Sequence, residues 1–224
     1  MRKKREFLRE RFFRQINRVR MENLRSRISP HFTFNVLGRE INQFNGSEEV
    51  KHNLMELVKY LRRSLELTEK LSVSLQDELD FVRTYIELER GRVGEDFVAT
   101  ITVEDGLDAT RIMIPSMIVQ IPVENAIKHG LAGKDGKKEL MVYVSRETNG
   151  IRITVTDNGR GYLPQVVSAT RGTGTGLKVL YQTIQLLNTK NKSDKIRFNI
   201  TNRSDGQTGT EVSVYIPFRF SYDL

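Results

Sequence analysis

Residues 123–130 of this chain read Val-Glu-Asn-Ala-Ile-Lys-His-Gly, a polar stretch that closes a predicted helix on a glycine. Glu124 and Lys128 lie one helical turn apart and Asn125 is next to Glu124, so the three share one polar face. A carboxylate, an amide oxygen and an ammonium suit a hydrated Mg²⁺ ion and a polyphosphate, because magnesium keeps waters and takes few protein oxygens. The same residues also suit a plain solvent-exposed helix face.

Two glycine-containing segments follow along the chain. Residues 157–161, Asp-Asn-Gly-Arg-Gly, come directly after a predicted strand. There an aspartate can accept a hydrogen bond from an exocyclic amine, and flanking glycines let a flat ring approach the backbone. Residues 172–177, Gly-Thr-Gly-Thr-Gly-Leu, precede a predicted helix, where free backbone amides can bind phosphate. Taken alone, the first segment also reads as an ordinary turn, and the second matches neither the dinucleotide fingerprint nor a P-loop.

The elements around these segments predict an α+β fold. Ser74 followed by Asp77 forms a capping box for a helix that ends near Gly91 and Gly94, and Pro115 is expected to open the helix that ends at Gly130. Hydrophobic alternation and turn signals predict strands over residues 97–103, 141–145, 151–156, 196–200 and 211–216, and a last helix over residues 177–188. We therefore expect a two-layer α/β sandwich, with a mainly antiparallel sheet and the helices on one face.

The first 70 residues predict a helical hairpin instead. Apolar residues recur at helical spacing up to Ser29-Pro30, where a kink or a helix restart is expected, and Asn45-Gly46-Ser47 marks a turn. A second helix follows, with a face formed by Leu54, Leu57, Val58, Leu61 and Leu65. Two helices bury little surface, so we expect them to self-associate into a dimeric four-helix bundle.

The positive charge of the chain is confined to its N-terminal segment. The net charge is +8, and residues 1–30 carry eleven Arg or Lys against three Glu. The rest is neutral, which argues against a basic nucleic-acid face on a folded domain. No apolar signal segment and no run long enough to span a membrane occurs, and the absence of cysteine excludes disulfides and thiolate metal sites. A nucleic-acid arm, a segment beside an anionic membrane and a solvated charged helix all remain open.

In this order, the three polar segments resemble the asparagine box and the two glycine boxes of the ATPase domain shared by histidine kinases, DNA gyrase, MutL and a heat-shock chaperone family. The resemblance implies that Asn125 ligates Mg²⁺, that Asp157 binds the adenine amine and that Glu124 is the general base. It also implies further contacts to ATP from Lys128, His129, Gly159, Gly161, Gly172, Thr173, Gly174, Thr175, Gly176 and Leu177.

The first half resembles one group of these relatives. Residues 27–37, Arg-Ile-Ser-Pro-His-Phe-Thr-Phe-Asn-Val-Leu, are similar to the signature of the LytS/YehU-type sensor histidine kinases, and residues 74–92 resemble the linker helix of that family. The resemblance implies that His31 is the phosphoacceptor, with Asn35 one turn further on the same face. Two positions depart from the pattern: Gly38 stands where an Asn is frequent, and Phe32 leaves His31 without an adjacent acid.

This resemblance implies a two-component kinase that phosphorylates His31 from Mg-ATP and passes the phosphoryl group to an aspartate of a response regulator, expected to be of the LytTR type. Residues 1–70 would form the homodimeric phosphoacceptor helices, with residues 1–25 beside an anionic membrane, and residues 71–224 the ATP-binding domain. We expect the chain on the cytoplasmic side of the bacterial inner membrane, without its transmembrane sensor part and without direct nucleic-acid binding. The alternatives are another ATPase of this type, an anti-sigma-like serine kinase, or a degenerate kinase that acts as a dimeric scaffold.

Overall fold

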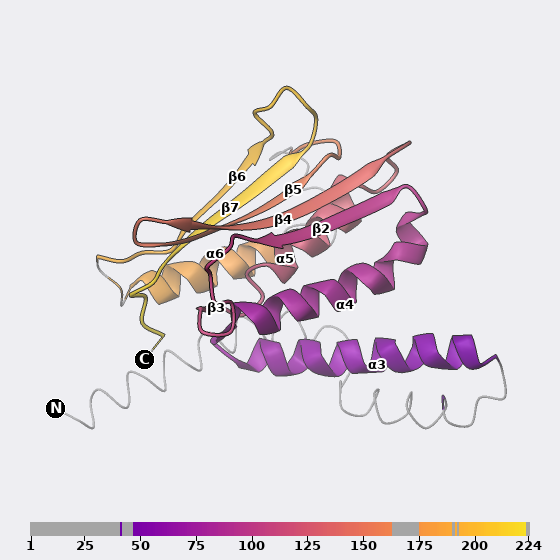
Figure 1. The fold of residues 1–224 in the computed structure, drawn as a ribbon, viewed down its shortest axis with the longest axis horizontal. Helices are drawn as coiled ribbons and strands as arrows, with labels where there is room; N and C mark the ends of the chain where they lie inside the picture. Colours follow the sequence, from indigo (N-terminus) through magenta and orange to yellow (C-terminus); the bar gives the residue numbers. More distant parts are fainter. Residues whose placement is uncertain (1–40, 42–46, 163–174, 190, 192, 223–224) are drawn as a thin grey trace. The chain divides into compact units, whose positions relative to one another are not determined.

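The computed structural model describes residues 41, 47–162, 175–189, 191 and 193–222 (Figure 1). The chain divides into two compact units, residues 1–70 and residues 71–223. The first predicted helix, the break at Ser29-Pro30, His31 and Asn35 lie outside the described residues. None of the described helices has both the length and the apolar character needed to cross a membrane.

The described part of the first unit is helix α3, Glu48–Glu69. It begins where Ser47 Oγ accepts a hydrogen bond from the backbone N–H of Val50 (3.3 Å), which satisfies one of the free donors of a helix start. Val58 is buried, whereas Leu57 on the predicted apolar face is 39% exposed. The second predicted helix is therefore present, and part of its apolar face remains open.

The second unit is built on a five-stranded sheet with the strand order β2-β4-β5-β7-β6. Strands β2 and β4 pair in parallel, and all other neighbours are antiparallel. A separate pair joins β1 to β3. The strands are β1 Ser72–Ser74, β2 Phe97–Val103, β3 Met113–Pro115, β4 Lys138–Glu147, β5 Gly150–Asp157, β6 Arg197–Asn202 and β7 Thr210–Pro217.

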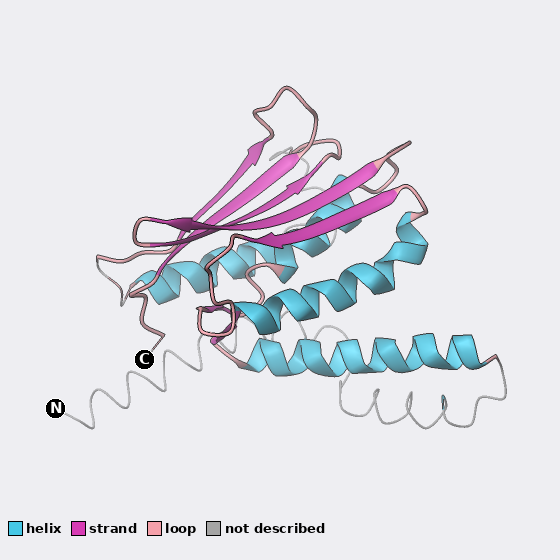
Figure 2. Cartoon of the chain, viewed as in Figure 1, coloured by secondary structure: helices cyan, strands magenta, loops and turns pink. Residues whose placement is uncertain are grey.

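Three helices lie on one face of this sheet (Figures 1 and 2). They are α4 Leu75–Val93, α5 Gln120–Asn125, which continues into a π-helical turn over Ala126–Gly130, and α6 Thr175–Asn188. Because side chains alternate along a strand, one face supplies the buried core, which includes Leu140, Val142, Val144, Ile151, Ile153, Val212, Val214 and Ile216. The expected α+β fold, with helices on one face of a mainly antiparallel sheet, is confirmed.

One helix start was predicted wrongly. Pro115 does not open a helix: it is the last residue of β3, and α5 begins five residues later at Gln120. The intervening turn includes Met117 with a φ of +69°. It is held by the buried carboxylate of Glu78 on α4, which accepts backbone N–H bonds from Met117 (2.9 Å), Val119 (3.0 Å) and Gln120 (3.2 Å). A distant acid, rather than the proline, therefore sets where α5 begins.

Candidate functional site

Asp157 is the last residue of β5, and only 4% of it is exposed. Its Oδ1 accepts backbone N–H bonds from Gly159 (2.8 Å) and Thr210 (3.4 Å). Burial raises the pKa of Asp157 above its ordinary value, and these two donors oppose the rise. The end of β5 thus carries a desolvated carboxylate. A hydrogen bond from a well-positioned donor to such a buried acceptor is stronger than the same bond in water.

Glycines bring the backbone close around this carboxylate. A Cβ on Gly159 would lie 2.1 Å from the carbonyl oxygen of Gly130, and a Cβ on Gly130 would lie 2.8 Å from Asp157 Oδ1. Gly161 has a φ of +86°, and a Cβ there would lie 2.7 Å from Asn202 Oδ1. A side chain at any of these three positions would displace a neighbouring atom, so only glycine fits there.

The π-helical turn Ala126–Gly130 follows Glu124 and Asn125 at the end of α5, and its last residue, Gly130, lies against Asp157. The backbone N–H of Leu131 donates to the carbonyl of Ala126 (2.8 Å), five residues back, and π-helical turns of this kind are frequent at functional sites. Lys128 is exposed and forms an ion pair with Glu124. Within the described residues, the buried Nδ2 of Asn125 has no hydrogen-bond partner. A water molecule or a bound group can satisfy a buried amide donor of this kind.

His129 and Arg160 connect the first polar segment to the second. The carbonyl of His129 accepts a hydrogen bond from Arg160 Nε (2.9 Å), and the backbone N–H of Arg160 donates to the carbonyl of Gly130 (3.3 Å). Burial, together with the positive charges of Lys128 and Arg160, lowers the pKa of His129. The imidazole is therefore neutral at neutral pH and can either donate or accept a hydrogen bond.

The third segment meets the site at the start of α6. A Cβ on Gly176 would lie 3.4 Å from Cγ2 of Ile121, so the first turn of α6 packs against α5. Thr175 is the first residue of α6 and Leu177 is half-buried, while Gly172, Thr173 and Gly174 lie outside the described residues. Because α6 is long, its N-terminal amides and dipole favour an anion at this end.

Two family models match the sequence. Residues 19–97 match the family described as histidine kinase, and residues 110–219 match the family described as histidine kinase-, DNA gyrase B-, and HSP90-like ATPase. The chain belongs to the histidine kinase family. Residues 110–219 of this histidine kinase chain therefore belong to an ATP-binding family, and Asp157, the bare glycines and Asn125 lie within them.

Curated relatives agree with this family. The chain is 28% identical over 202 residues to the sensor histidine kinase YpdA of Escherichia coli K12, a match that covers 90% of this chain and 34% of the relative. It is 32% identical over 197 residues to the sensor histidine kinase/phosphatase LytS of Staphylococcus aureus MRSA252, covering 84% of this chain and 33% of that protein. The chain thus spans about a third of the length of the curated relatives it matches.

A solved structure supports the fold. The histidine kinase domain of the blue-light activated histidine kinase EL346 from Erythrobacter litoralis superposes with a TM-score of 0.50 at 16% sequence identity. The match covers 94% of each chain. At this identity the likeness concerns the arrangement of the elements and not the chemistry of the site.

The residues of this site fit ATP. Asp157 can accept from an exocyclic amine, Gly130, Gly159 and Gly161 let the backbone approach closely around that carboxylate, and the buried Nδ2 of Asn125 has no hydrogen-bond partner among the described residues. For a metal ion, Asn125 and Glu124 are the oxygen donors at hand. Within the described ranges, no group of three or more His, Asp or Glu is arranged to hold a metal, and a hydrated Mg²⁺ that also takes phosphate oxygens needs no such group.

Sequence reasoning missed Glu78, the residue that holds the start of α5. A signal was present, because Glu78 falls on the same helical face as Leu75, Leu79 and Val82, all of which are fully buried. A carboxylate in the middle of an apolar stripe must find hydrogen-bond donors when it is buried. The identity of those donors, three amides about forty positions further along the chain, was not contained in the pattern.

Proposed function

We propose that the chain is the kinase core of a homodimeric sensor histidine kinase, which transfers the γ-phosphoryl group of Mg-ATP to His31 and then to an aspartate of a response regulator. The observation that carries the proposal is the buried Asp157 carboxylate enclosed by Gly130, Gly159 and Gly161, together with the unpartnered buried Nδ2 of Asn125 at the end of α5. A bound Mg²⁺ would supply charge neutralisation for the triphosphate, held through the amide oxygen of Asn125.

The residues of the site divide the work of binding and orientation. Asp157 accepts the N–H of the adenine amine, and Gly159 and Gly161 let the ring lie against the backbone. Lys128 and the neutral His129 contact the phosphates, together with the segment from Gly172 to Leu177 and the N-terminus of α6. These contacts fix the γ-phosphorus for attack, since phosphoryl transfer depends mainly on positioning and charge stabilisation.

The covalent step joins a nitrogen of the His31 imidazole to the γ-phosphorus while the bond to the β,γ-bridging oxygen breaks and ADP leaves. A neutral imidazole has the free electron pair for this attack, and the unperturbed pKa of histidine of about 6.5 allows it near neutral pH. We assign Glu124 as the base that accepts the proton and Asn35 as the residue that orients His31. The phosphoryl group then passes to the carboxylate of the response regulator, which we infer to be of the LytTR type.

We assign residues 1–70 to dimerisation and the phosphoacceptor, and residues 71–224 to ATP binding. The half-exposed apolar face of α3, on which Leu57 is 39% exposed, supports a second copy as its partner. The eleven basic residues among residues 1–30 support a position of residues 1–25 next to anionic lipid on the cytoplasmic side of the inner membrane.

Discrimination between ATP and ITP tests the nucleotide site. At position 6 of the purine ITP carries an oxygen acceptor instead of the amine donor of ATP, and its N1 carries an N–H donor where adenine has an acceptor. Calorimetric titration of the full chain with His31→Gln, which prevents turnover, should show ATP binding about a hundredfold more tightly, since the oxygen faces a buried acceptor.

Asp157→Asn should abolish this preference, because an amide donates to oxygen as readily as it accepts from an amine. The matched control is Asp205→Asn in the β6–β7 connection, where the carboxylate is half-exposed and pairs with Arg203, and it should leave the preference intact. Equal affinity for ATP and ITP in the reference chain would refute the role of Asp157.

A further inference from the structure

A cavity lies in the second unit, at the opposite end of β5 from Asp157. We call it the basal pocket, and its volume is about 420 Å³. The loop between β2 and β3, the β4–β5 hairpin and the segment after β7 line it, through residues 106–108, 111–113, 146, 151, 216–218, 220 and 222. Ile151 in its wall is six residues before Asp157 on β5, or about 20 Å along a strand. A ligand in the basal pocket would therefore not touch a nucleotide bound at Asp157.

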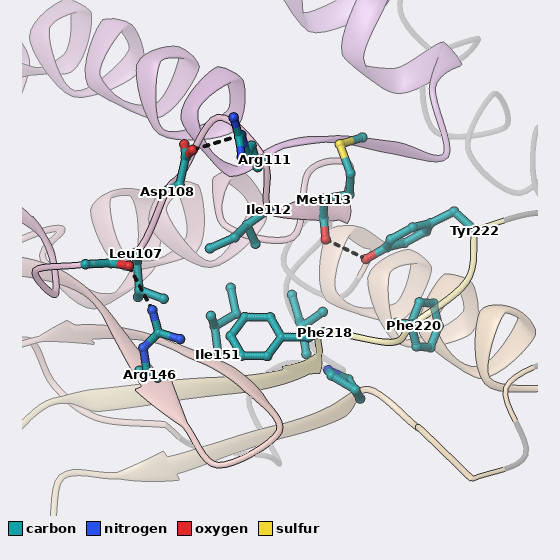
Figure 3. A pocket seen from close by; sticks show the side chains of 13 residues that line it. Leu107, Asp108, Arg111, Ile112, Met113, Arg146, Ile151, Phe218, Phe220 and Tyr222 are labelled. Atoms are coloured by element: carbon teal, nitrogen blue, oxygen red, sulfur yellow. Dashed lines mark hydrogen bonds and ion pairs between the residues drawn. The ribbon is translucent and has the colours of Figure 1, made fainter.

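The floor of the basal pocket is apolar. Ile151, Ile216 and Phe220 are all buried, and Figure 3 shows Ile112, Ile151 and Phe218 gathered at its centre. At the mouth, Met113 is 44% and Phe218 is 48% exposed. The hydroxyl of Tyr222 donates to the carbonyl of Met113 (3.1 Å), which ties the segment after β7 to β3 and closes one side (Figure 3). A hollow of this size with an apolar floor matches the ordinary dimensions of a small-molecule site.

The rim of the basal pocket carries two arginines, Arg111 and Arg146, and one acid, Asp108. Arg111 forms an ion pair with Asp108 (3.2 Å), so its charge is balanced. Arg146 donates one hydrogen bond to the carbonyl of Gly106 (2.8 Å), and its guanidinium lies 5.8 Å from the centre of the Phe218 ring. Among the described residues, Arg146 has no ion-pair partner.

The acids near Arg146 are already engaged. Glu104 accepts the backbone N–H of Arg146 (2.8 Å), and Glu147 pairs with Arg152. Both line a shallower hollow next to the basal pocket, together with Arg146 and Phe218. The guanidinium of Arg146 is solvent-exposed, keeps several N–H groups without a partner among the described residues, and is held by the Gly106 carbonyl and the Phe218 ring, while the Glu104 carboxylate lies beside its backbone.

We propose that the basal pocket binds a small organic acid, with an apolar body on the accessible side chains of Leu107, Ile112 and Phe218 and its carboxylate on the guanidinium of Arg146. The apolar body of the ligand matches the size and the accessible lining of the pocket, and its carboxylate matches the guanidinium of Arg146, for which the described residues supply no ion-pair partner. A guanidinium can bind a carboxylate through two parallel N–H bonds, which gives orientation as well as affinity.

Sodium octanoate is a suitable probe, and octan-1-ol is its uncharged counterpart of the same chain length. Titration of the ¹⁵N-labelled full chain with octanoate should give saturable shifts of the backbone amides of residues 106–113, 146–151 and 218–222, with the amide of Asp157 unmoved. Arg146→Gln should weaken octanoate binding about tenfold, the loss expected for one charged hydrogen bond, and should leave octanol binding unchanged.

Two control variants are matched to the two contacts. Arg197→Gln removes another guanidinium held over an aromatic ring, 4.2 Å from the centre of Tyr215, and should bind octanoate normally. Phe218→Ser should abolish binding, whereas Met141→Ser, a similarly exposed apolar residue on the outer face of the sheet, should not. Equal binding by Arg146→Gln, equal affinity for octanol and octanoate, or no saturable shift would overturn the proposal. The proposal would also be overturned if the reference chain self-associated with rising concentration and Phe218→Ser did not, because the pocket would then be a contact between copies of the chain.

Discussion

Replacing Glu78 by alanine should destabilise the start of α5 by at least about 2 kcal/mol, since two buried N–H donors and one part-buried donor would lose their acceptor, and each buried one costs about 1–3 kcal/mol when unsatisfied. The donors are the amides of Met117, Val119 and Gln120, at 2.9, 3.0 and 3.2 Å from a carboxylate that is fully buried. Glu78→Gln should cost less, about 1–3 kcal/mol, because the remaining oxygen still accepts while the new amide donor faces an N–H.

Hydrogen exchange over residues 116–130 measures this loss directly, as a fall in the free energy of local opening. Nucleotide affinity should fall with it, because α5 carries Asn125. The control is Glu87→Ala on the exposed side of the same helix, where the side chain is 65% exposed and pairs with Arg90. An exposed pair contributes about 0.2–1 kcal/mol. If Glu78→Ala exchanged no faster over residues 116–130 than Glu87→Ala, the assignment of α5 positioning to Glu78 would be wrong.

Three further predictions concern the rest of the chain. Gly159→Ala should abolish ATP binding in calorimetry, since its Cβ would lie 2.1 Å from the carbonyl oxygen of Gly130. The control Gly91→Ala on α4, whose Cβ would have nothing within 4 Å, should bind ATP normally and stabilise the fold by up to about 1 kcal/mol. Normal ATP binding by Gly159→Ala would contradict this reasoning. Asp157→Asn should raise the free energy of unfolding at neutral pH, because burial raises the pKa of Asp157 in the folded chain. In the reference chain, the stabilising contribution of Asp157 is present below its unfolded pKa of 3.8 and is lost as pH rises through its folded pKa. Urea unfolding should therefore show that the variant is more stable than the reference chain at neutral pH and not at acidic pH. Residues 1–25 should confer binding to anionic vesicles, and this binding should weaken as the salt concentration rises. If the chain without residues 1–25 sedimented with vesicles at low salt as well as the full chain does, the basic residues of this segment would belong to a solvated helix.

Local patterns predicted those elements whose causes are local. Strand β2 occupies the predicted residues 97–103, because its alternation and flanking turns lie within ten positions. Helix α4 begins after Ser74 as expected, since Ser74 Oγ accepts the N–H of Asp77 (3.0 Å). The end of the helix that contains residues 123–130 was also predicted correctly, since Gly130 ends the π-helical turn that continues α5.

Features that depend on distant partners were not predictable in this way. The false helix start at Pro115 followed from a local rule that the buried Glu78 overrides from α4. The parallel pairing of β2 with β4 leaves no mark in either strand alone. Likewise, the glycine at position 159 reads as a turn residue, and only the fold shows that it faces the carbonyl of Gly130.

Phosphorylation of His31 is the most direct test of the account. The full chain is incubated with ATP labelled in the γ-phosphate, beside His31→Gln and the control His52→Gln, whose side chain is exposed on α3. We expect acid-labile, alkali-stable label on the reference chain and on His52→Gln, and none on His31→Gln. Label on His31→Gln equal to that of the reference chain, or acid-stable label on a hydroxyl group, would contradict the assignment of this chain as a kinase acting on its own histidine.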